Sequence, residues 1–294
     1  MLKSARKSSR IYYLLSLALI IAILYISFNL QESKVLEVHF IDVGQADSIL
    51  IKTPDGNSIL IDGGNNADGP GLLSYLKKEG IKEFMAIIAT HPHEDHIGGL
   101  DTIINAYPVK EIYLPAVTTN TKTFEDFINA VNNSNAKRIK AEAGVRLNIP
   151  DVSGVFLAPC SEKYDNLNEY SAVLRLVYKD TAFLFTGDVE AVSESQILLS
   201  QVELEADILK VAHHGSNSST TPSFLKNVSP IYAIISVGKG NRYGHPSKQT
   251  LERLIAAGVK IYRTDEVGTI VVISDGKNIE IEERGPLIQS SASR

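Results

Sequence analysis

The sequence predicts an α/β (α+β) domain in which two mixed β-sheets pack face to face and helices cover the outside. Apolar segments of strand length cluster toward both ends of the domain, and strands alternate with helical segments between them. Turn-forming sequences such as PDGN and GQAD separate these segments. The chain has 294 residues, of which 44% are hydrophobic, so it is long enough to bury the core that two packed sheets require.

In the first half of the domain, three predicted strands precede the first helix, which Gly80 ends. Predicted strands in this half are 35–44, 47–54, 57–64, 84–89 and 111–115. Predicted helices are 71–80, a segment after residue 99, and 124–133.

In the second half, strands and helices alternate again before a closing hairpin at 268–283, which turns at Asp275-Gly276. Predicted strands are 152–159, 171–180, 181–188, 206–212 and 231–237, and predicted helices are 191–200 and 248–258. A loop is predicted between the last two of these strands.

The N-terminus differs from this domain. Residues 1–10 carry four basic side chains and no acid, and residues 11–30 carry no charge at all. Twenty apolar residues in a helix span about 30 Å, the thickness of the hydrocarbon core of a bilayer. With Glu32 and Glu37 on the other side, the positive-inside rule predicts a cytoplasmic N-terminus and an extracellular domain. A cleaved signal peptide is the alternative, which the lack of a small-x-small cleavage site disfavours.

We therefore expect a single-pass cell-membrane protein with its catalytic domain on a bacterial surface. Its segments are a cytoplasmic end (1–10), a transmembrane anchor (11–30), a linker (31–34), the folded domain (35–285) and a flexible tail (286–294). Cys160 is the only cysteine, so no intrachain disulfide can form. Without residues 1–34 the chain has 24 basic and 33 acidic residues, a net charge of −9. A phosphate-rich substrate would therefore need local positive charge.

The most informative segment is THPHEDHIGG, residues 90–99, which places three histidines and two acids within six positions. It follows a predicted strand, and extended residues two apart point the same way, so His91 and His93 can converge on one ion. Asp95 and His96 can face a second position beside it. Imidazole and carboxylate groups bind zinc and similar divalent metals. A solvated polar loop is the simpler alternative, but four such residues in H-x-H-x-D-H spacing favour a metal site.

Further candidate ligands lie where other predicted strands end. Asp188 follows the apolar segment FLFTG, and His213 and His214 follow ILKVA. For His39, which lies within a strand, we expect no role in the site.

A basic loop around His245 is the remaining candidate. Lys239, Arg242 and Lys248 lie in this loop, and no acid occurs between residues 239 and 251. This composition favours a loop that faces a phosphate group.

Together these segments resemble a known family. HPHEDHIGG resembles the signature of the metallo-β-lactamase superfamily. With FIDVGQADSILI, ILIDGG, SAVLRL, FTGD, LKVAHHGS and YGHPS, residues 37–273 resemble the hydrolase domain of ComEC-type DNA-internalisation competence proteins. They are also similar to the phosphorylcholine esterase domains of surface proteins. The resemblance implies an αββα sandwich with a dinuclear metal site, holding Zn or Mn, at the edge of the sheets.

The resemblance also implies a role for each residue. It implies that His91 and His93 hold the first metal, that Asp95 and His96 hold the second, and that Asp188 bridges the two. One histidine of the 213–214 pair completes the second site. We favour His214, which directly precedes a glycine, and expect His213 to face the substrate. Asp62 corresponds to the buried acid that orients groups around the metals.

The sequence departs from the usual family pattern in two places. No histidine occurs between residues 97 and 212, where typical members have a further ligand; Asn168 and Ser171 lie in that stretch, and we expect Asn168 to contact the substrate. GQAD, with Ala46, replaces the commoner GQGD.

The predicted function is that of a phosphodiesterase or nuclease in which two metal ions activate a hydroxide. Asp95, His213 and His245 are the predicted catalytic residues, and Lys239 and Arg242 are predicted to bind a phosphate-containing substrate, either nucleic acid or an envelope polymer. Alternatives are a phosphorylcholine-type esterase, a lactonase or β-lactamase-like hydrolase, and a non-catalytic surface DNA-binding module related to competence. The sequence predicts no particular protein partner.

Overall fold

The computed structural model describes residues 15–21 and 34–286. The chain divides into two compact units, residues 1–34 and 35–294. In the first unit, residues 15–21 are helical. The second unit contains all the elements named below. Of the predicted tail at 286–294, only residue 286 is described.

The prediction of a membrane anchor at 11–30 is corrected by the structure. Among residues 15–21 and 34–286, no helix combines the length and the apolar character that crossing a bilayer requires. The single-pass location and the membrane partner that we expected from this segment are therefore wrong as stated. Residues 11–14 and 22–30 of the predicted span lie outside the described residues.

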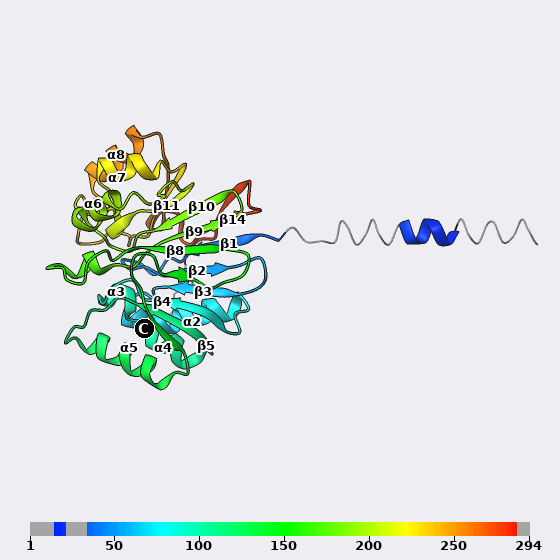
Figure 1. Ribbon diagram of the computed structural model, residues 1–294, viewed down its shortest axis with the longest axis horizontal. Coiled ribbons are helices and arrows are strands. Elements are labelled where there is room, and N and C mark those ends of the chain that lie inside the picture. Colours follow the sequence, from blue (N-terminus) through cyan, green and yellow to red (C-terminus); the bar gives the residue numbers. More distant parts are fainter. Residues whose placement is uncertain (1–14, 22–33, 287–294) are drawn as a thin grey trace, which may run out of the picture. The chain divides into compact units, whose positions relative to one another are not determined.

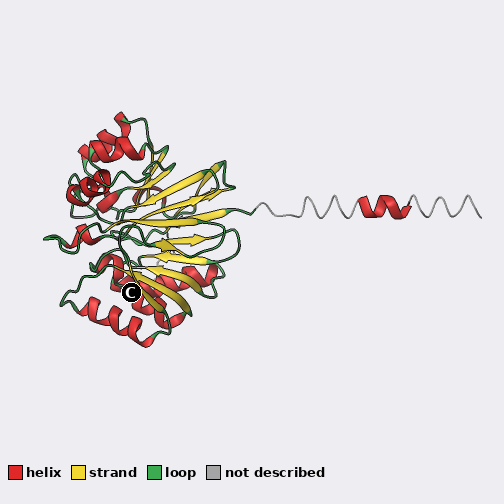
Figure 2. Cartoon of the chain, in the orientation of Figure 1, coloured by secondary structure: helices red, strands yellow, loops and turns green. Residues whose placement is uncertain are grey.

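The second unit is built on two mixed sheets, as predicted, with helices on their outer sides (Figures 1 and 2). In spatial order the first sheet contains β15 (Ile279–Glu283), β14 (Ile270–Ser274), β1 (Leu36–Phe40), β2 (Ile49–Lys52), β3 (Ser58–Ile61), β4 (Phe84–Ile88), β5 (Val109–Leu114) and β6 (Lys137–Lys140). The second contains β13 (Lys260–Arg263), β12 (Tyr232–Ile235), β11 (Ile208–Lys210), β10 (Thr181–Phe185), β9 (Val173–Tyr178), β8 (Ser153–Ala158) and β7 (Arg146–Leu147).

Alternation along the strands separates two kinds of surface on each sheet. In β1, Val38 and Phe40 enter the core between the sheets, where they meet residues such as Phe185 and Ile208 from the second sheet. His39 lies on the opposite face of the same strand, where it is buried and contacts Tyr75 and Glu37. The core between the sheets is therefore formed by the inward-facing residues of both.

Each outer face has its own layer of helices, which gives the αββα order. Helices α2 (Gly69–Lys78), α4 (Leu100–Ala106) and α5 (Lys122–Asn133) bury apolar residues against the first sheet. Helices α6 (Ala191–Leu199), α7 (Pro222–Val228) and α8 (Lys248–Ala256) do the same against the second. Short elements complete the unit: α3 (Glu94–Ile97), α9 (Thr264–Val267), η1 (Asn66–Asp68), η2 (Leu167–Tyr170) and η3 (Ala212–Gly215).

The direction of the strands gathers the candidate residues at one edge of each sheet. β3 and β4 are parallel, with Ile61 opposite Ile88. β10, β11 and β12 are also parallel to one another. Because the carboxyl ends of parallel strands lie at the same edge, the loops after these strands meet there. Those loops carry Asp62, the THPHEDHIGG segment, Asp188, the histidine pair and the basic loop.

Candidate metal centre

The THPHEDHIGG segment follows β4, includes the short helix α3 and ends where α4 begins. His93 has an extended backbone, with φ −78° and ψ 151°, and directly precedes α3. Nε2 of the buried His91 lies 2.9 Å from Nδ1 of His93, so the two rings are in direct contact. That they hold one ion together stays a prediction.

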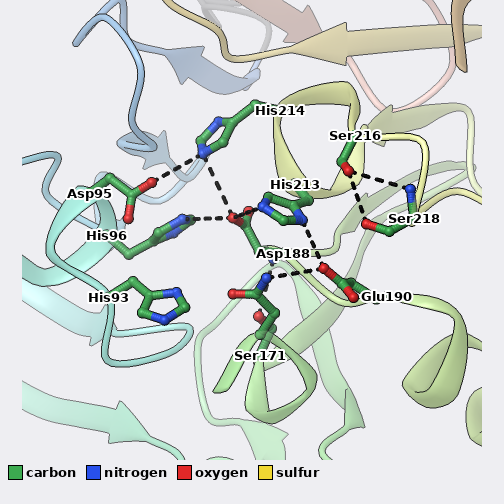
Figure 3. Close-up of polar contacts among 12 residues, drawn as sticks. His93, Asp95, His96, Ser171, Asp188, Glu190, His213, His214, Ser216 and Ser218 are labelled. Atoms are coloured by element: carbon green, nitrogen blue, oxygen red, sulfur yellow. Dashed lines mark hydrogen bonds and ion pairs between the residues drawn. The ribbon is translucent and has the colours of Figure 1, made fainter. Parts of the chain in front are cut away.

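Asp95, His96, Asp188 and His214, here called the four-residue cluster, form the centre of the site (Figure 3). One ligand atom from each lies within 4.8 Å of those of the others. Oδ2 of Asp188 is 3.2 Å from Nε2 of His96 and 3.7 Å from Nε2 of His214. Oδ2 of Asp95 is 3.4 Å from the same atom of His214. Asp188 therefore lies between the histidines, as a bridging carboxylate would.

The four-residue cluster fits a divalent cation. Within the described part of the chain, three of its buried atoms lack a well-formed hydrogen bond: His96 Nε2, His214 Nε2 and Asp188 Oδ1. A buried polar atom without a partner destabilises the fold by about 1–3 kcal/mol, which coordination to a cation would remove. Imidazole nitrogen with carboxylate oxygen is the donor set of zinc and related metals.

A layer of buried groups beneath the cluster fixes its histidines. Asp62 accepts hydrogen bonds from the backbone and hydroxyl of Thr90, and its Oδ2 lies 2.7 Å from Nδ1 of His96. Nδ1 of His214 lies 2.8 Å from the carbonyl oxygen of Ser236. With Nδ1 engaged in this way, each ring presents Nε2 to the centre. Asp62 thus lies where the resemblance implied.

The buried ion pair of Asp47 and Lys210 forms a second part of this layer and was not predicted from the sequence. Both side chains are almost completely buried, and Nζ of Lys210 contacts Oδ2 of Asp47. The same ammonium is 3.9 Å from Oδ1 of Asp188, and Oδ1 of Asp47 is 3.5 Å from Nδ1 of His214. A signal was present in the sequence, because Lys210 is the only charged residue in the apolar segment ILKVA.

His213 and His214 both have left-handed backbones, with φ 50° and φ 52°, and their side chains have different partners. His214 enters the cluster, whereas Nδ1 of His213 lies 3.1 Å from Oε1 of Glu190. Asn168 and Asn166 donate their side-chain amides to the carboxylate of Glu190. Asn168 is buried, and its contact with the substrate stays a prediction. The hydroxyl oxygen of Ser171 lies 3.3 Å from Nδ1 of His91.

The basic loop after β12 lies beside the histidines. The ring of His245 is 5.5 Å from the ring of His213 and 6.5 Å from that of His214. Lys239 and Arg242 are exposed in the same loop. The structure thus brings His245 close to the centre and leaves the two cations at its rim.

The double glycine of the motif has a packing role. A Cβ on Gly98 would lie 2.3 Å from the backbone nitrogen of Asn66, and one on Gly99 would lie 2.3 Å from the carbonyl oxygen of Gly63. The backbone N–H of Gly98 donates to Glu94 and that of Gly99 to Gly64. These N–H groups are therefore engaged within the protein and are not free for an anion.

Burial and charge divide the histidines into two groups. Burial, together with the nearby His96, holds the pKa of His91 well below its usual value, and burial lowers the pKa of His93. Burial also opposes the charging of His96, but Asp188 and Asp62 outweigh it and raise its pKa well above the usual value. Burial disfavours the charged form of Asp188 too, yet His96, His214 and Lys210 hold its pKa well below the usual range. Burial therefore favours the neutral form of His91 and His93, the form that binds metals.

Comparison with known proteins identifies the family. The metallo-beta-lactamase superfamily matches residues 41–239, more than half of the chain. The chain belongs to the metallo-beta-lactamase superfamily. The fold agrees: the metallo-beta-lactamase fold protein YhfI from Bacillus subtilis superposes with a TM-score of 0.55 at 17% identity, covering 82% of this chain and 100% of that one. CmlA, a diiron beta-hydroxylase from Streptomyces venezuelae, gives a TM-score of 0.53 at 12% identity, covering 78% and 52%.

Similar curated proteins confirm the resemblance to competence proteins. ComE operon protein 3 of Bacillus subtilis is 31% identical over 251 residues, which cover 80% of this chain and 32% of that protein. Competence protein ComA of Neisseria gonorrhoeae is 29% identical over 230 residues, covering 78% and 31%. Recombination protein 2 of Haemophilus influenzae is 30% identical over 252 residues, covering 84% and 30%. The chain thus spans about a third of the length of these relatives.

Membership of this superfamily and the four-residue cluster together make the chain a metal-dependent hydrolase. The fold normally binds one or two divalent metals, and the four-residue cluster is a group that could hold one.

Proposed function

We propose that this metallo-hydrolase is a phosphodiesterase. The observation that most supports this is the basic loop beside the four-residue cluster: His245 lies 6.5 Å from His214, and Lys239 and Arg242 lie at the rim with no acid between residues 239 and 251. A phosphodiester carries one negative charge, and its transition state concentrates more negative charge on the reacting oxygens. Relatives named for competence and recombination are consistent with a phosphate-containing substrate.

We assign the cluster residues to two cations, Zn or Mn. His91 and His93 would hold one, and Asp95, His96 and His214 the other, with Asp188 between them. When bound, such ions supply Lewis acidity and lower the pKa of water toward neutrality. His214 is assigned as the ligand rather than His213 because its Nε2 faces both Asp95 and Asp188, at 3.4 and 3.7 Å.

The remaining residues act on the substrate and on protons. Asp95 has a carboxylate at the cluster and a partly exposed side chain, so it can accept a proton at Oδ2. His213 presents Nε2 toward the cluster, 3.9 Å from Asp188, while Glu190 holds Nδ1. From there it can donate a hydrogen bond to a phosphoryl oxygen. His245, in the basic loop, can also donate a hydrogen bond to a phosphoryl oxygen. Lys239 and Arg242 bind the flanking phosphates. Asn168 acts through Glu190, as a positioning residue.

Metal analysis and substrate comparison test this proposal. The full-length chain is loaded with Zn or Mn and assayed with bis(p-nitrophenyl) phosphate, single-stranded DNA and a chromogenic cephalosporin. We expect one to two equivalents of metal and cleavage of the phosphodiesters. Asp95→Ala should lower the turnover of both phosphodiesters at least about 100-fold, whereas Asp126→Ala, on the exposed face of α5, should not.

Cephalosporin cleavage without phosphodiester cleavage would contradict the proposal and favour a β-lactamase-like hydrolase. A protein that binds DNA but holds less than one equivalent of metal would instead favour a non-catalytic binding module.

A further inference from the structure

Tyr243, in the basic loop, is an unusual residue on this surface. Its side chain is 58% exposed, and among residues 15–21 and 34–286 no other aromatic residue is classed as exposed.

The loop that carries Tyr243 is held rigidly although it lies at the surface. The side chain of Asn241 makes four hydrogen bonds: its Oδ1 accepts from the backbone of Tyr243 at 3.1 Å and of His245 at 3.0 Å, and its Nδ2 donates to the carbonyl oxygens of Gly238 at 3.0 Å and of His245 at 2.6 Å. The backbone of Gly238 in turn donates to Oε1 of Gln45 at 3.0 Å. A binding surface that is fixed in advance loses less entropy when a ligand binds.

The rings form a series that leads from the four-residue cluster to solvent. The rings of His214 and His245 are stacked at 6.5 Å with an angle of 28° between them. The rings of His245 and Tyr243 are stacked at 5.8 Å with an angle of 25°. The guanidinium carbon of Arg242 lies 5.2 Å from the centre of the Tyr243 ring. Tyr243 is therefore two rings away from a metal-ligating position, with a cation beside it.

We propose that Tyr243 and Arg242 form a subsite for a flat heteroaromatic ring next to the scissile phosphate, so that the preferred substrate is a nucleotide phosphodiester. This inference rests on the proposed phosphodiesterase function. Bases stack on aromatic rings and on guanidinium groups, because every base has a π-face. The cations of the loop then bind the phosphates on either side of the stacked base.

The charge of the loop disfavours the other ligand that aromatic rings bind, a quaternary ammonium group. Such a cation is normally enclosed by several aromatic rings and attracted by the negative faces of their π-systems. Here there is one exposed ring, Arg242 lies over it, and no acid occurs from residue 239 to residue 251. A phosphorylcholine headgroup would therefore be repelled from Tyr243.

The test compares a thymidine tetranucleotide with the same backbone lacking its bases, using the metal-loaded full-length chain. We expect kcat/KM to be about 5- to 100-fold higher for the tetranucleotide. Tyr243→Leu should bring the ratio close to one, while Tyr243→Phe should keep it. Ile255→Ala, an exposed apolar residue on α8, serves as control and should also keep the ratio. A wild-type ratio near one, with the abasic backbone still cleaved, would overturn the subsite and leave the phosphodiesterase function intact.

A binding measurement decides the case in which neither oligomer is cleaved. An oligonucleotide containing 2-aminopurine should lose fluorescence on binding to the wild type and to Tyr243→Phe but not to Tyr243→Leu. If the change in fluorescence on binding is the same for all three proteins, the inference is overturned. A preference for p-nitrophenyl phosphorylcholine over ethyl p-nitrophenyl phosphate that is lost in Tyr243→Leu would also overturn it, in favour of a quaternary ammonium ligand.

Discussion

Glu190 lies beside His213, with Oε1 of the acid 3.1 Å from Nδ1 of the ring, and Nε2 on the other side of that ring faces Asp188 at 3.9 Å (Figure 3). Glu190 is itself held by the amides of Asn166 and Asn168. A carboxylate at Nδ1 fixes the orientation and tautomer of an imidazole. We therefore expect Glu190 to act as a positioning residue for His213, a histidine that is not in the four-residue cluster.

Glu190→Ala should lower kcat/KM for a phosphodiester about 10- to 100-fold, because the ring of His213 loses its orientation. Metal content should be unchanged, and Glu190→Asp should recover part of the activity. Steady-state kinetics with metal analysis by mass spectrometry checks this, with Glu252→Ala on the exposed side of α8 as control. Loss of metal together with activity would show that Glu190 acts on the cluster instead.

His214→Ala should reduce bound metal by about one equivalent, whereas His213→Ala should keep the metal and lose activity. The reason is geometric, since only His214 has Nε2 within 3.7 Å of both Asp95 and Asp188. Asp188→Ala and His93→Ala should both lose activity, while their circular dichroism spectra should remain those of the folded wild type. Full metal content in His214→Ala would reverse the assignment of the pair.

Lys210→Met should destabilise the protein by about 3–5 kcal/mol, because it leaves the carboxylate of Asp47 buried without its partner. The double variant Asp47→Asn, Lys210→Met should be less destabilised than the sum of its single variants, since both charges are then removed. Urea unfolding in the presence of a chelator measures the four proteins. Removal of the exposed pair of Lys122 and Asp126 should have little effect and serves as control. If the destabilisation of the double variant equals the sum of the two single destabilisations, the two residues are not a coupled pair.

Glu37→Gln should destabilise the protein at neutral pH and much less in acid. A hydrogen bond from His39, together with Lys52, lowers the pKa of Glu37 from 4.5 to about 2. Because the pKa is lower in the folded than in the unfolded state, this stabilisation is present above pH 4.5 and is lost as the pH falls toward 2. Urea unfolding at pH 6 and pH 3 measures the free energy of unfolding of Glu37→Gln and of Glu83→Gln, an exposed control. At pH 6 the value for Glu37→Gln should be about 1 kcal/mol lower than that for the control. A pH-independent difference would contradict this origin.

Much of the fold could be predicted because its strands are buried and its helices amphipathic. The short apolar segments at β3, β4 and β10 bury nearly all of their side chains as strands within the sheets, as their length and composition predict. β6 was not predicted because its sequence is KRIK and three of its four residues are exposed at the sheet edge. Helix α7 was assigned to a loop, although Thr221 caps it and Pro222 begins it.

The candidate site shows a similar division. Ligand spacing in THPHEDHIGG could be interpreted from the sequence, because it depends on local backbone geometry. The partnership of Asp47 with Lys210 joins residues 163 positions apart on different sheets, and no local pattern contains it. The hydrogen bond from the amide of Asn168 to Glu190 could not be predicted from the sequence either, because tertiary packing brings the two residues together.

The cluster has a mechanical consequence for the whole sandwich. Asp95 and His96 are attached to the first sheet, and Asp188 and His214 to the second. A cation held by all four would cross-link the two halves of the protein at one edge, whereas the opposite edge is joined without a metal, by contacts such as the hydrogen bond between Thr181 and Ser274. Chelation should therefore speed amide hydrogen exchange in the loops after β4 and β11 far more than in the hairpin of β14 and β15.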